Sequence, residues 1–153
     1  MNKYYILKSV VENEDYFAEK GNTSEEDIYR ESVSGISLKN KNVKIELKKN
    51  KGKVQNNIEN LYGIPIISEL ISNILLNTCP NEIELFEVKV NMSTNLKYCF
   101  LNILDNLDAI NLLESILVEI IPETKVFSEI EKLVLDDFKV SSRQIFRLKH
   151  FRA

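Results

Sequence analysis

The single histidine of this chain, His150, is the first candidate for acid-base chemistry. Histidine is the side chain whose unperturbed charge changes near neutral pH, which makes it the usual general base. A nucleophilic serine or cysteine needs such a base beside it, but none in this sequence has a spacing that marks it as a partner. We therefore interpret His150 as a histidine on the surface or at a sheet edge.

Three carboxylates form the second candidate site. Asp105, Asp108 and Glu114 follow a strongly apolar segment, and loops at the ends of buried strands often hold functional side chains. Carboxylates can act as general acids, general bases or metal ligands when they converge. The same spacing is also that of a polar turn. A hydrolase that uses Asp105, Asp108 or Glu114 is therefore an alternative to a non-catalytic protein, and we predict neither a metal site nor a cofactor.

Cys79 and Cys99 are the only cysteines, and they form neither a CxxC motif nor a short metal-ligand spacing. We expect two ordinary core thiols rather than a disulfide or a redox pair.

The composition is that of an ordinary globular protein, with 44% hydrophobic and 28% charged residues. Its 153 residues fit one domain, and we predict a single domain over residues 1–153. The net charge of −3 gives no general attraction to nucleic acid or to an anionic membrane. The N-terminus has too short an apolar core for a signal peptide, and no run reaches the roughly 20 apolar residues of a membrane span. We predict a cytoplasmic protein that binds neither nucleic acid nor membranes.

Charge is unevenly distributed in the first third of the chain. Residues 12–31 hold eight acidic side chains against Lys20 and Arg30, and seven lysines follow between residues 39 and 53. We interpret the lysines as a solvated face, because the interleaved aromatic residues of a nucleic-acid site are missing. Val43–Leu47 alternates apolar and charged residues, which predicts a half-buried edge strand. Residues 12–35 are otherwise poorly patterned, and the sequence assigns them no role.

The clearest helix begins after Ser68, which we expect to cap it. Its apolar residues recur at the spacing of one helical stripe: Ile67, Leu70, Ile71, Ile74 and Leu75. Two strand-like runs follow at Ile83–Val90 and Leu96–Leu104, and the second is apolar on both faces, as a central strand is. The first is expected to have one wet face, with a bulge between Leu85 and Val88. The residues expected on that face are Glu82, Glu84, Glu87 and Lys89.

Weaker strand patterns occur at residues 4–7, 116–121, 132–135 and 144–149. Together these elements predict an α+β protein with a mainly antiparallel sheet packed with a few short helices.

Several segments occur in an order that resembles a known bacterial family. They are Gly63-Ile-Pro-Ile-Ile-Ser-Glu-Leu, Ile83-Glu-Leu-Phe-Glu-Val-Lys-Val, Tyr98-Cys-Phe-Leu-Asn-Ile-Leu and Leu107-Asp-Ala-Ile-Asn, followed by Glu131-Lys-Leu-Val-Leu-Asp and Arg143-Gln-Ile-Phe-Arg-Leu-Lys-His-Phe. This ordered series resembles the eleventh immunity-protein family of polymorphic toxin systems. The resemblance covers the chain from Leu61 onward, with Tyr4-Tyr-Ile-Leu as weaker support.

The resemblance implies a non-catalytic binding protein that neutralises a cognate toxin in a tight complex, by covering the toxin's active site or substrate channel. A toxin that acts on nucleic acid is usually basic, and acidic groups on the inhibitor would complement its charge. The predicted toxin contacts are therefore Glu25, Glu26, Asp27, Asp136 and Asp137.

The end of the chain departs from this family. Members typically continue into another strand and a serine-capped helix, whereas this sequence stops at Ala153. We therefore expect the domain to lack this strand-helix element, which would leave a strand at Ile145–Leu148 open to a partner chain. A homodimer through that edge, or a self-associating structural subunit, is the remaining alternative.

Overall fold

The computed structural model describes residues 4–5, 17–19, 25–49, 57–60, 65–91, 96–119 and 127–149. Within these ranges the strands are β1 (Phe17–Glu19), β2 (Ile45–Lys49), β3 (Asn57–Asn60), β4 (Ile66–Ser68), β5 (Ile83–Asn91), β6 (Tyr98–Ile103), β7 (Asn106–Leu107), β8 (Ile116–Glu119), β9 (Phe127–Lys132) and β10 (Arg147–Leu148). The helices are α1 (Glu25–Val33), α2 (Glu69–Thr78) and α3 (Asp137–Val140). None of these helices has the length and apolar character that crossing a membrane requires.

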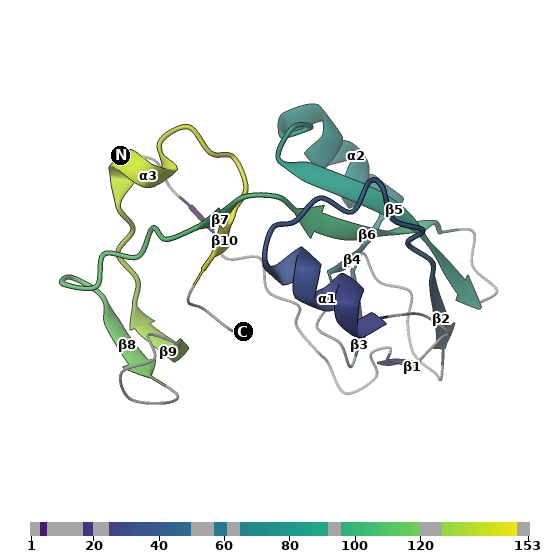
Figure 1. Ribbon diagram of the computed structural model, residues 1–153, viewed down its shortest axis with the longest axis horizontal. Helices are drawn as coiled ribbons and strands as arrows, with labels where there is room; N and C mark the ends of the chain where they lie inside the picture. The colour runs from purple at the N-terminus through teal and green to yellow at the C-terminus, as the bar shows by residue number, and fades with distance from the viewer. Residues whose placement is uncertain are drawn as a thin grey trace.

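Six strands close into a barrel in the order β1-β2-β5-β6-β4-β3 (Figure 1). Four of the six neighbouring pairs are antiparallel. The most extensive pair joins β5 to β6, from Ile83 opposite Ile103 to Val88 opposite Tyr98. The predicted α+β class with a mainly antiparallel sheet is therefore confirmed.

The prediction that Val43–Leu47 forms an edge strand is wrong. In the structure β2 lies between β1 and β5, and its Ile45 stands opposite Val88 in a parallel pair. Closing a sheet into a barrel gives every strand a neighbour on each side, so the exposed Glu46 faces outward from the wall rather than marking an edge. Glu46 and Lys89 pair across this outer surface, with 3.8 Å between Oε1 and Nζ.

The central position predicted for β6 is confirmed, because both of its faces are buried. On the inner side of the barrel, Tyr98 and Phe100 pack with Ile28 of α1. On the other side, Leu101 and Ile103 pack in a second cluster with residues of α2. Figure 1 shows α2 above β5 and β6 and α1 below them, so β6 separates the two clusters.

Helix α2 begins where the sequence predicts, although Ser68 makes no capping hydrogen bond through its side chain. The predicted apolar stripe is only half correct. Ile71 and Leu75 pack against the sheet, whereas Leu70 and Ile74 are exposed. The sheet covers one side of the helix, and the covered arc is narrower than the apolar stripe.

The bulge predicted in β5 is also wrong. The pairing with β6 advances one residue at a time through Leu85 and Val88 without a shift. The alternation of apolar and charged residues changes along β5 because the strand is covered on both faces near its start and on only one face near its end. Glu84 therefore lies in the buried part and is only 4% exposed, whereas Glu87 and Lys89 are exposed as predicted.

A glycine turn after α1 brings the next residues against the barrel. Gly35 has a φ of 72°, and the Ile36 N–H donates to the Glu31 carbonyl, which closes the helix in a left-handed turn. A Cβ at Gly35 would lie 2.4 Å from the Leu104 carbonyl oxygen, so a larger residue would have to displace the backbone. Residues 36–38 are thereby placed beside β5 and β6.

The remaining described elements form a smaller group beside the barrel, at the left of Figure 1. There β7 pairs in parallel with β10, and β8 pairs antiparallel with β9. The strand predicted at residues 132–135 is misplaced, because β9 ends at Lys132 and Leu135 makes only an isolated bridge to Ile110. The strand expected at Ile145–Leu148 is shorter than predicted. Only Arg147–Leu148 form a strand, β10, which has β7 as a neighbour.

Residues 6 and 7 of the strand predicted at residues 4–7 fall outside the described residues, and the described Tyr4 and Tyr5 are not in a strand. Tyr4 is described, and its hydroxyl donates to the Val140 carbonyl at 2.7 Å. Its ring also meets the edge of Phe146, with 5.5 Å between the ring centroids. Tyr4 therefore anchors the N-terminal segment to α3 and to the residues before β10.

Candidate functional site

The five acidic residues predicted as contacts lie in two separate parts of the molecule. Glu25, Glu26 and Asp27 form the first turn of α1 beside the barrel, and their side chains lie outside the described part of the structure. Asp136 and Asp137 lie at the start of α3, in the smaller group of elements (Figure 1). The fold therefore does not bring the two acidic groups to one surface.

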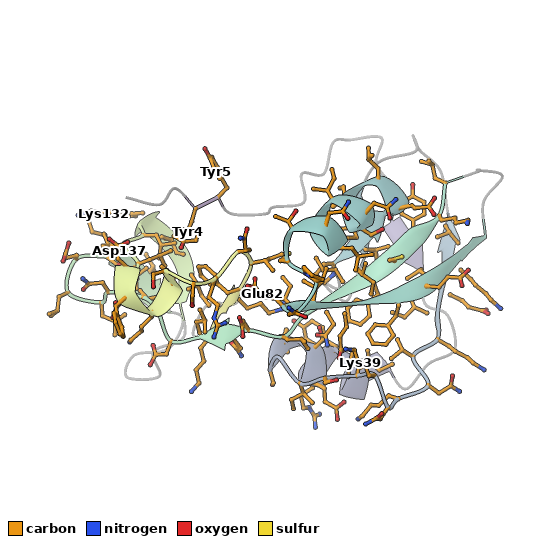
Figure 2. The ribbon with its side chains drawn as sticks, turned by 90° about the horizontal axis from the view of Figure 1, so that it is seen from above. Tyr4, Tyr5, Lys39, Glu82, Lys132 and Asp137 are labelled. Atoms are coloured by element: carbon orange, nitrogen blue, oxygen red, sulfur yellow. The ribbon has the colours of Figure 1, made fainter. Side chains whose placement is uncertain are left out.

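The two aspartates of the second group have different surroundings. The Asp136 carboxylate caps α3 by accepting from the backbone N–H groups of Phe138 and Lys139, at 3.1 and 3.4 Å. It also lies 3.7 Å from the Lys139 Nζ. Asp137 is exposed, and Figure 2 labels it beside α3. Asp136 is thus a helix cap, and Asp137 is the aspartate that faces solvent.

Two of the three carboxylates of the hydrolase alternative are held by different neighbours. Asp105 pairs with Arg143, with 3.0 Å between Oδ2 and Nε, and Glu114 accepts from the Asn111 side chain at 2.9 Å. Asp108 is exposed. Across the described residues, no group of three or more histidine, cysteine, aspartate or glutamate side chains could hold a metal ion. His150 lies outside the described residues.

The most deeply buried carboxylate is one that the sequence places on a wet face. Glu84 accepts hydrogen bonds from the Ser37 hydroxyl, from the Leu38 N–H at 2.8 Å and from the Asn102 side chain at 3.0 Å. Burial acts to raise the pKa of Glu84, but these hydrogen bonds and the charge of Lys39 outweigh it and lower the pKa below its ordinary value. This carboxylate ties residues 36–38 to the barrel.

Both cysteines are free thiols, with Cys79 buried and Cys99 half-buried. Burial, with the nearby charge of Glu82, raises the pKa of Cys79. Burial also raises the pKa of Cys99, and a hydrogen bond with Ser72 offsets only part of that effect. A raised thiol pKa lowers reactivity near neutral pH, as expected for structural cysteines.

Arg147 of β10 is a cation with incomplete pairing inside the protein. Its Nε and Nη2 are shielded from solvent and have no hydrogen-bond partner among the described residues. The Oδ1 atom of Asn106, which stands opposite Arg147 in β7, is also buried and without a partner there. Burial lowers the pKa of Arg147, and Tyr29 opposes this only in part.

We expect Arg147→Met to raise the free energy of unfolding by about 1 kcal/mol, because it removes buried N–H groups that make no hydrogen bonds and keeps an apolar stem. Urea unfolding at neutral pH measures this change. The matched control is Arg143→Met, which loses the ion pair with Asp105 and should lower stability by up to about 1 kcal/mol. A loss of stability in Arg147→Met as large as in the control would show that the Arg147 guanidinium has a stabilising partner.

Three large apolar side chains are almost fully exposed. Leu113, Phe138 and Tyr5 are 98%, 91% and 88% exposed, and the next value among the described large apolar residues is 62%, for Leu70 of α2. Leu113 precedes β8, Phe138 belongs to α3, and Tyr5 follows the residue that is bound to the end of α3. All three therefore belong to the smaller group of elements or lie against it, and none belongs to the barrel.

We call the described residues 108–119 and 127–140 the C-terminal module. The residues of this module include seven acidic residues and two lysines, although the whole chain carries a net charge of only −3. Glu114 directly follows Leu113, and Asp137 directly precedes Phe138. The module therefore joins exposed apolar side chains to a strongly acidic segment.

The sequence analysis named Asp136 and Asp137 as candidate contacts, but it did not predict the exposure of Leu113 and Phe138. The available signal was an isolated large apolar residue among charged neighbours, since Phe138 stands between Asp137 and Lys139. Such a residue in an expected turn lies outside any apolar stripe that could bury it.

The model of one protein family, described as Immunity protein family (Imm11), matches residues 2–153. No curated protein matches the chain.

Proposed function

Because the chain belongs to the immunity protein family Imm11, we propose that it is a non-catalytic binding protein that neutralises a cognate bacterial toxin in a tight complex. The family match, which spans residues 2–153, is the observation that carries this proposal. The protein would act in the cytoplasm of the cell that makes the toxin, where it would block the toxin before release.

The proposed mechanism is steric and electrostatic. A specific protein interface covers about 800 Å² on each partner, which is enough to close an active site or a substrate channel. A toxin that acts on nucleic acid needs cationic groups for the phosphates, and acidic side chains on the inhibitor complement them. Glu25, Glu26, Asp27, Asp136 and Asp137 remain the proposed acidic contacts, although Asp136 also serves as the cap of α3.

The described geometry gives no support to the hydrolase alternative. Asp105 is engaged by Arg143 and Glu114 by Asn111, so two of its three carboxylates already serve local structure. General acid-base catalysis needs groups that converge on one reacting atom, and these contacts hold Asp105 and Glu114 to different neighbours.

Growth rescue tests the proposed function directly. A host cell would express the toxin-like product of the neighbouring gene, with and without this protein. We expect growth to stop without the protein, to resume with it, and the two proteins to purify together as a complex. A toxic product that this protein neither rescues nor binds would contradict the pairing. Rescue without a stable complex would contradict neutralisation by tight binding.

A further inference from the structure

We propose that Leu113, Phe138 and Tyr5 are the apolar anchors of the toxin-docking surface, and that the toxin surface that covers them is cationic. This inference rests on the proposed immunity function and adds the location of the interface and the chemistry of the partner. It places the interface on the C-terminal module and the adjoining N-terminal segment rather than on the barrel. Of the proposed acidic contacts, Asp136 and Asp137 lie within this surface, whereas Glu25, Glu26 and Asp27 of α1 lie outside it.

The first argument is the exposure of these side chains. Exposed apolar residues of ordinary proteins are scattered, but here the three most exposed large apolar side chains among the described residues all lie in the C-terminal module or directly against it. Covering them with a partner removes their apolar surface from water and so favours association. Aromatic residues such as Phe138 and Tyr5 are also enriched among the residues that dominate binding energy.

The second argument is that ordered backbone presents these side chains. Around Leu113, a turn is closed by the Leu113 N–H donating to the Asn111 Oδ1 at 3.2 Å and by the Ser115 N–H donating to the Asn111 carbonyl at 3.0 Å. At the start of α3, the Phe138 N–H donates to the Asp136 carboxylate at 3.1 Å. Binding through preorganised residues loses less conformational entropy than binding through mobile ones.

Tyr5 is held in a comparable way by its neighbour. Tyr4 is bound to the Val140 carbonyl and packs against Phe146, which fixes the backbone next to Tyr5. Figure 2 shows Tyr5 pointing away from the rest of the molecule while Tyr4 reaches toward α3. Tyr5 and Phe138 therefore present two aromatic side chains near the same helix.

The third argument is the charge around the anchors. Asp137, Glu114 and Glu131 are exposed in the module, whereas one of its cations, Lys139, is engaged by the Asp108 carbonyl at 2.8 Å and by Asp136. An acidic surface with apolar anchors favours a partner whose lysines and arginines surround apolar recesses.

The same charge pattern disfavours a second copy of this chain as the occupant. In a two-fold symmetric dimer, each patch meets its own copy, so Asp137 and Glu114 would approach acidic groups of the partner. Gel filtration at several concentrations tests this point, and we expect no dimer through the module.

Helix α2 supplies the matched control. Leu70 and Ile74 are its exposed apolar residues, at 62% and 57%, but the charge beside them is already paired, with 3.8 Å between Glu69 Oε1 and Lys97 Nζ. The α2 surface therefore exposes apolar side chains without the excess of acidic residues that the module has.

The test measures binding to the purified toxin-like product of the neighbouring gene. The double variant Leu113→Ser with Phe138→Ser should weaken binding at least about 30-fold, the effect of losing one hot-spot residue. The control Leu70→Ser with Ile74→Ser should bind within about threefold of the wild type, the scale of surface-neutral changes. Circular dichroism and thermal unfolding confirm that both variants fold, as expected for exposed positions.

The outcomes separate the two proposals. If the wild type binds and the module variant binds equally well, the docking surface is wrong and the proposed function stands. If the α2 variant loses binding instead, the interface lies on the barrel side. If the wild type does not bind, the proposed function fails, and this inference fails with it.

Charge reversal tests the cationic nature of the partner. Asp137→Lys with Glu131→Lys should slow association about tenfold at low salt, and the difference should shrink at high salt, because steering acts through screened charges. Glu87→Lys on β5 is the control and should leave the association rate near that of the wild type. Equal association rates for the module variant and the wild type at low salt would show that the partner surface is not cationic.

Discussion

Replacing Phe100 by alanine is expected to lower the free energy of unfolding by about 3–5 kcal/mol, the usual cost of truncating a buried phenylalanine. Phe100 is 0% exposed, stands opposite Ile66 and Phe86 in the neighbouring strands, and belongs to the cluster inside the barrel. Its ring stacks with that of Phe86, with 5.9 Å between centroids. The alanine variant would leave a cavity in the centre of the barrel.

Phe138→Ala is the matched control, because it makes the same chemical change at an exposed position. It should change the free energy of unfolding by no more than about 0.5 kcal/mol. Urea unfolding of both variants measures the difference. Equal destabilisation would mean that the ring of Phe138 is covered in solution, which would also remove a main support of the proposed docking surface.

Replacing Glu84 by leucine is expected to lower the free energy of unfolding by about 1–3 kcal/mol. The buried Leu38 N–H would lose its acceptor, and a buried donor left unpaired costs about that much, whereas the hydroxyl of the exposed Ser37 can bond to water instead. The Asn102 amide would lose one of two acceptors, because it also donates to the Ile36 carbonyl at 3.0 Å. Residues 36–38 should then lose their attachment to the barrel.

Glu84→Gln separates the shape of this residue from its charge. Glutamine can accept from the Leu38 N–H and donate to the Ser37 oxygen, so we expect a smaller loss of stability than in the leucine variant. A glutamine variant as unstable as the leucine variant at neutral pH would show that the negative charge, rather than the set of hydrogen bonds, holds this loop.

The pH dependence of Glu84 has a definite sign. The hydrogen bonds from Ser37, Leu38 and Asn102 overcome the opposing effect of burial and lower the pKa of Glu84 below its ordinary value of 4.5. The stability that this group contributes is therefore present above pH 4.5 and is lost as the pH falls through the lower pKa of the folded state. The stability difference between the wild type and Glu84→Gln should accordingly shrink in acid. A difference that grows in acid would contradict a lowered pKa.

The fold could be predicted from the sequence where a residue pattern was compatible with only one kind of structure. The apolar run at Tyr98–Ile103 indicated a strand covered on both faces, and the structure confirms it. Barrel closure was not visible, because β1 and β3 are short, and their pairing depends on contacts distant in sequence. The wet face predicted at Glu84 was wrong because two of its hydrogen-bond donors, Ser37 and Leu38, come from a loop 47 and 46 residues away.

The candidate site was only partly visible for a similar reason. The charge of Asp136 and Asp137 could be read from the sequence, but the use of Asp136 as a helix cap could not. Leu113 and Phe138 resemble core residues by type, and only the three-dimensional arrangement shows that nothing described in this chain covers them. Exposure depends on the packing of the whole fold, which local periodicity does not report.

The most direct test of the central claim is the dissociation constant of the wild-type protein with the purified toxin-like product of the neighbouring gene, measured by calorimetry at low and high salt. The account predicts a complex with a Kd of about 10 nM or below that weakens as the salt concentration rises. No detectable complex at micromolar concentrations would contradict the immunity function. A tight complex whose affinity does not depend on salt would contradict the acidic docking surface.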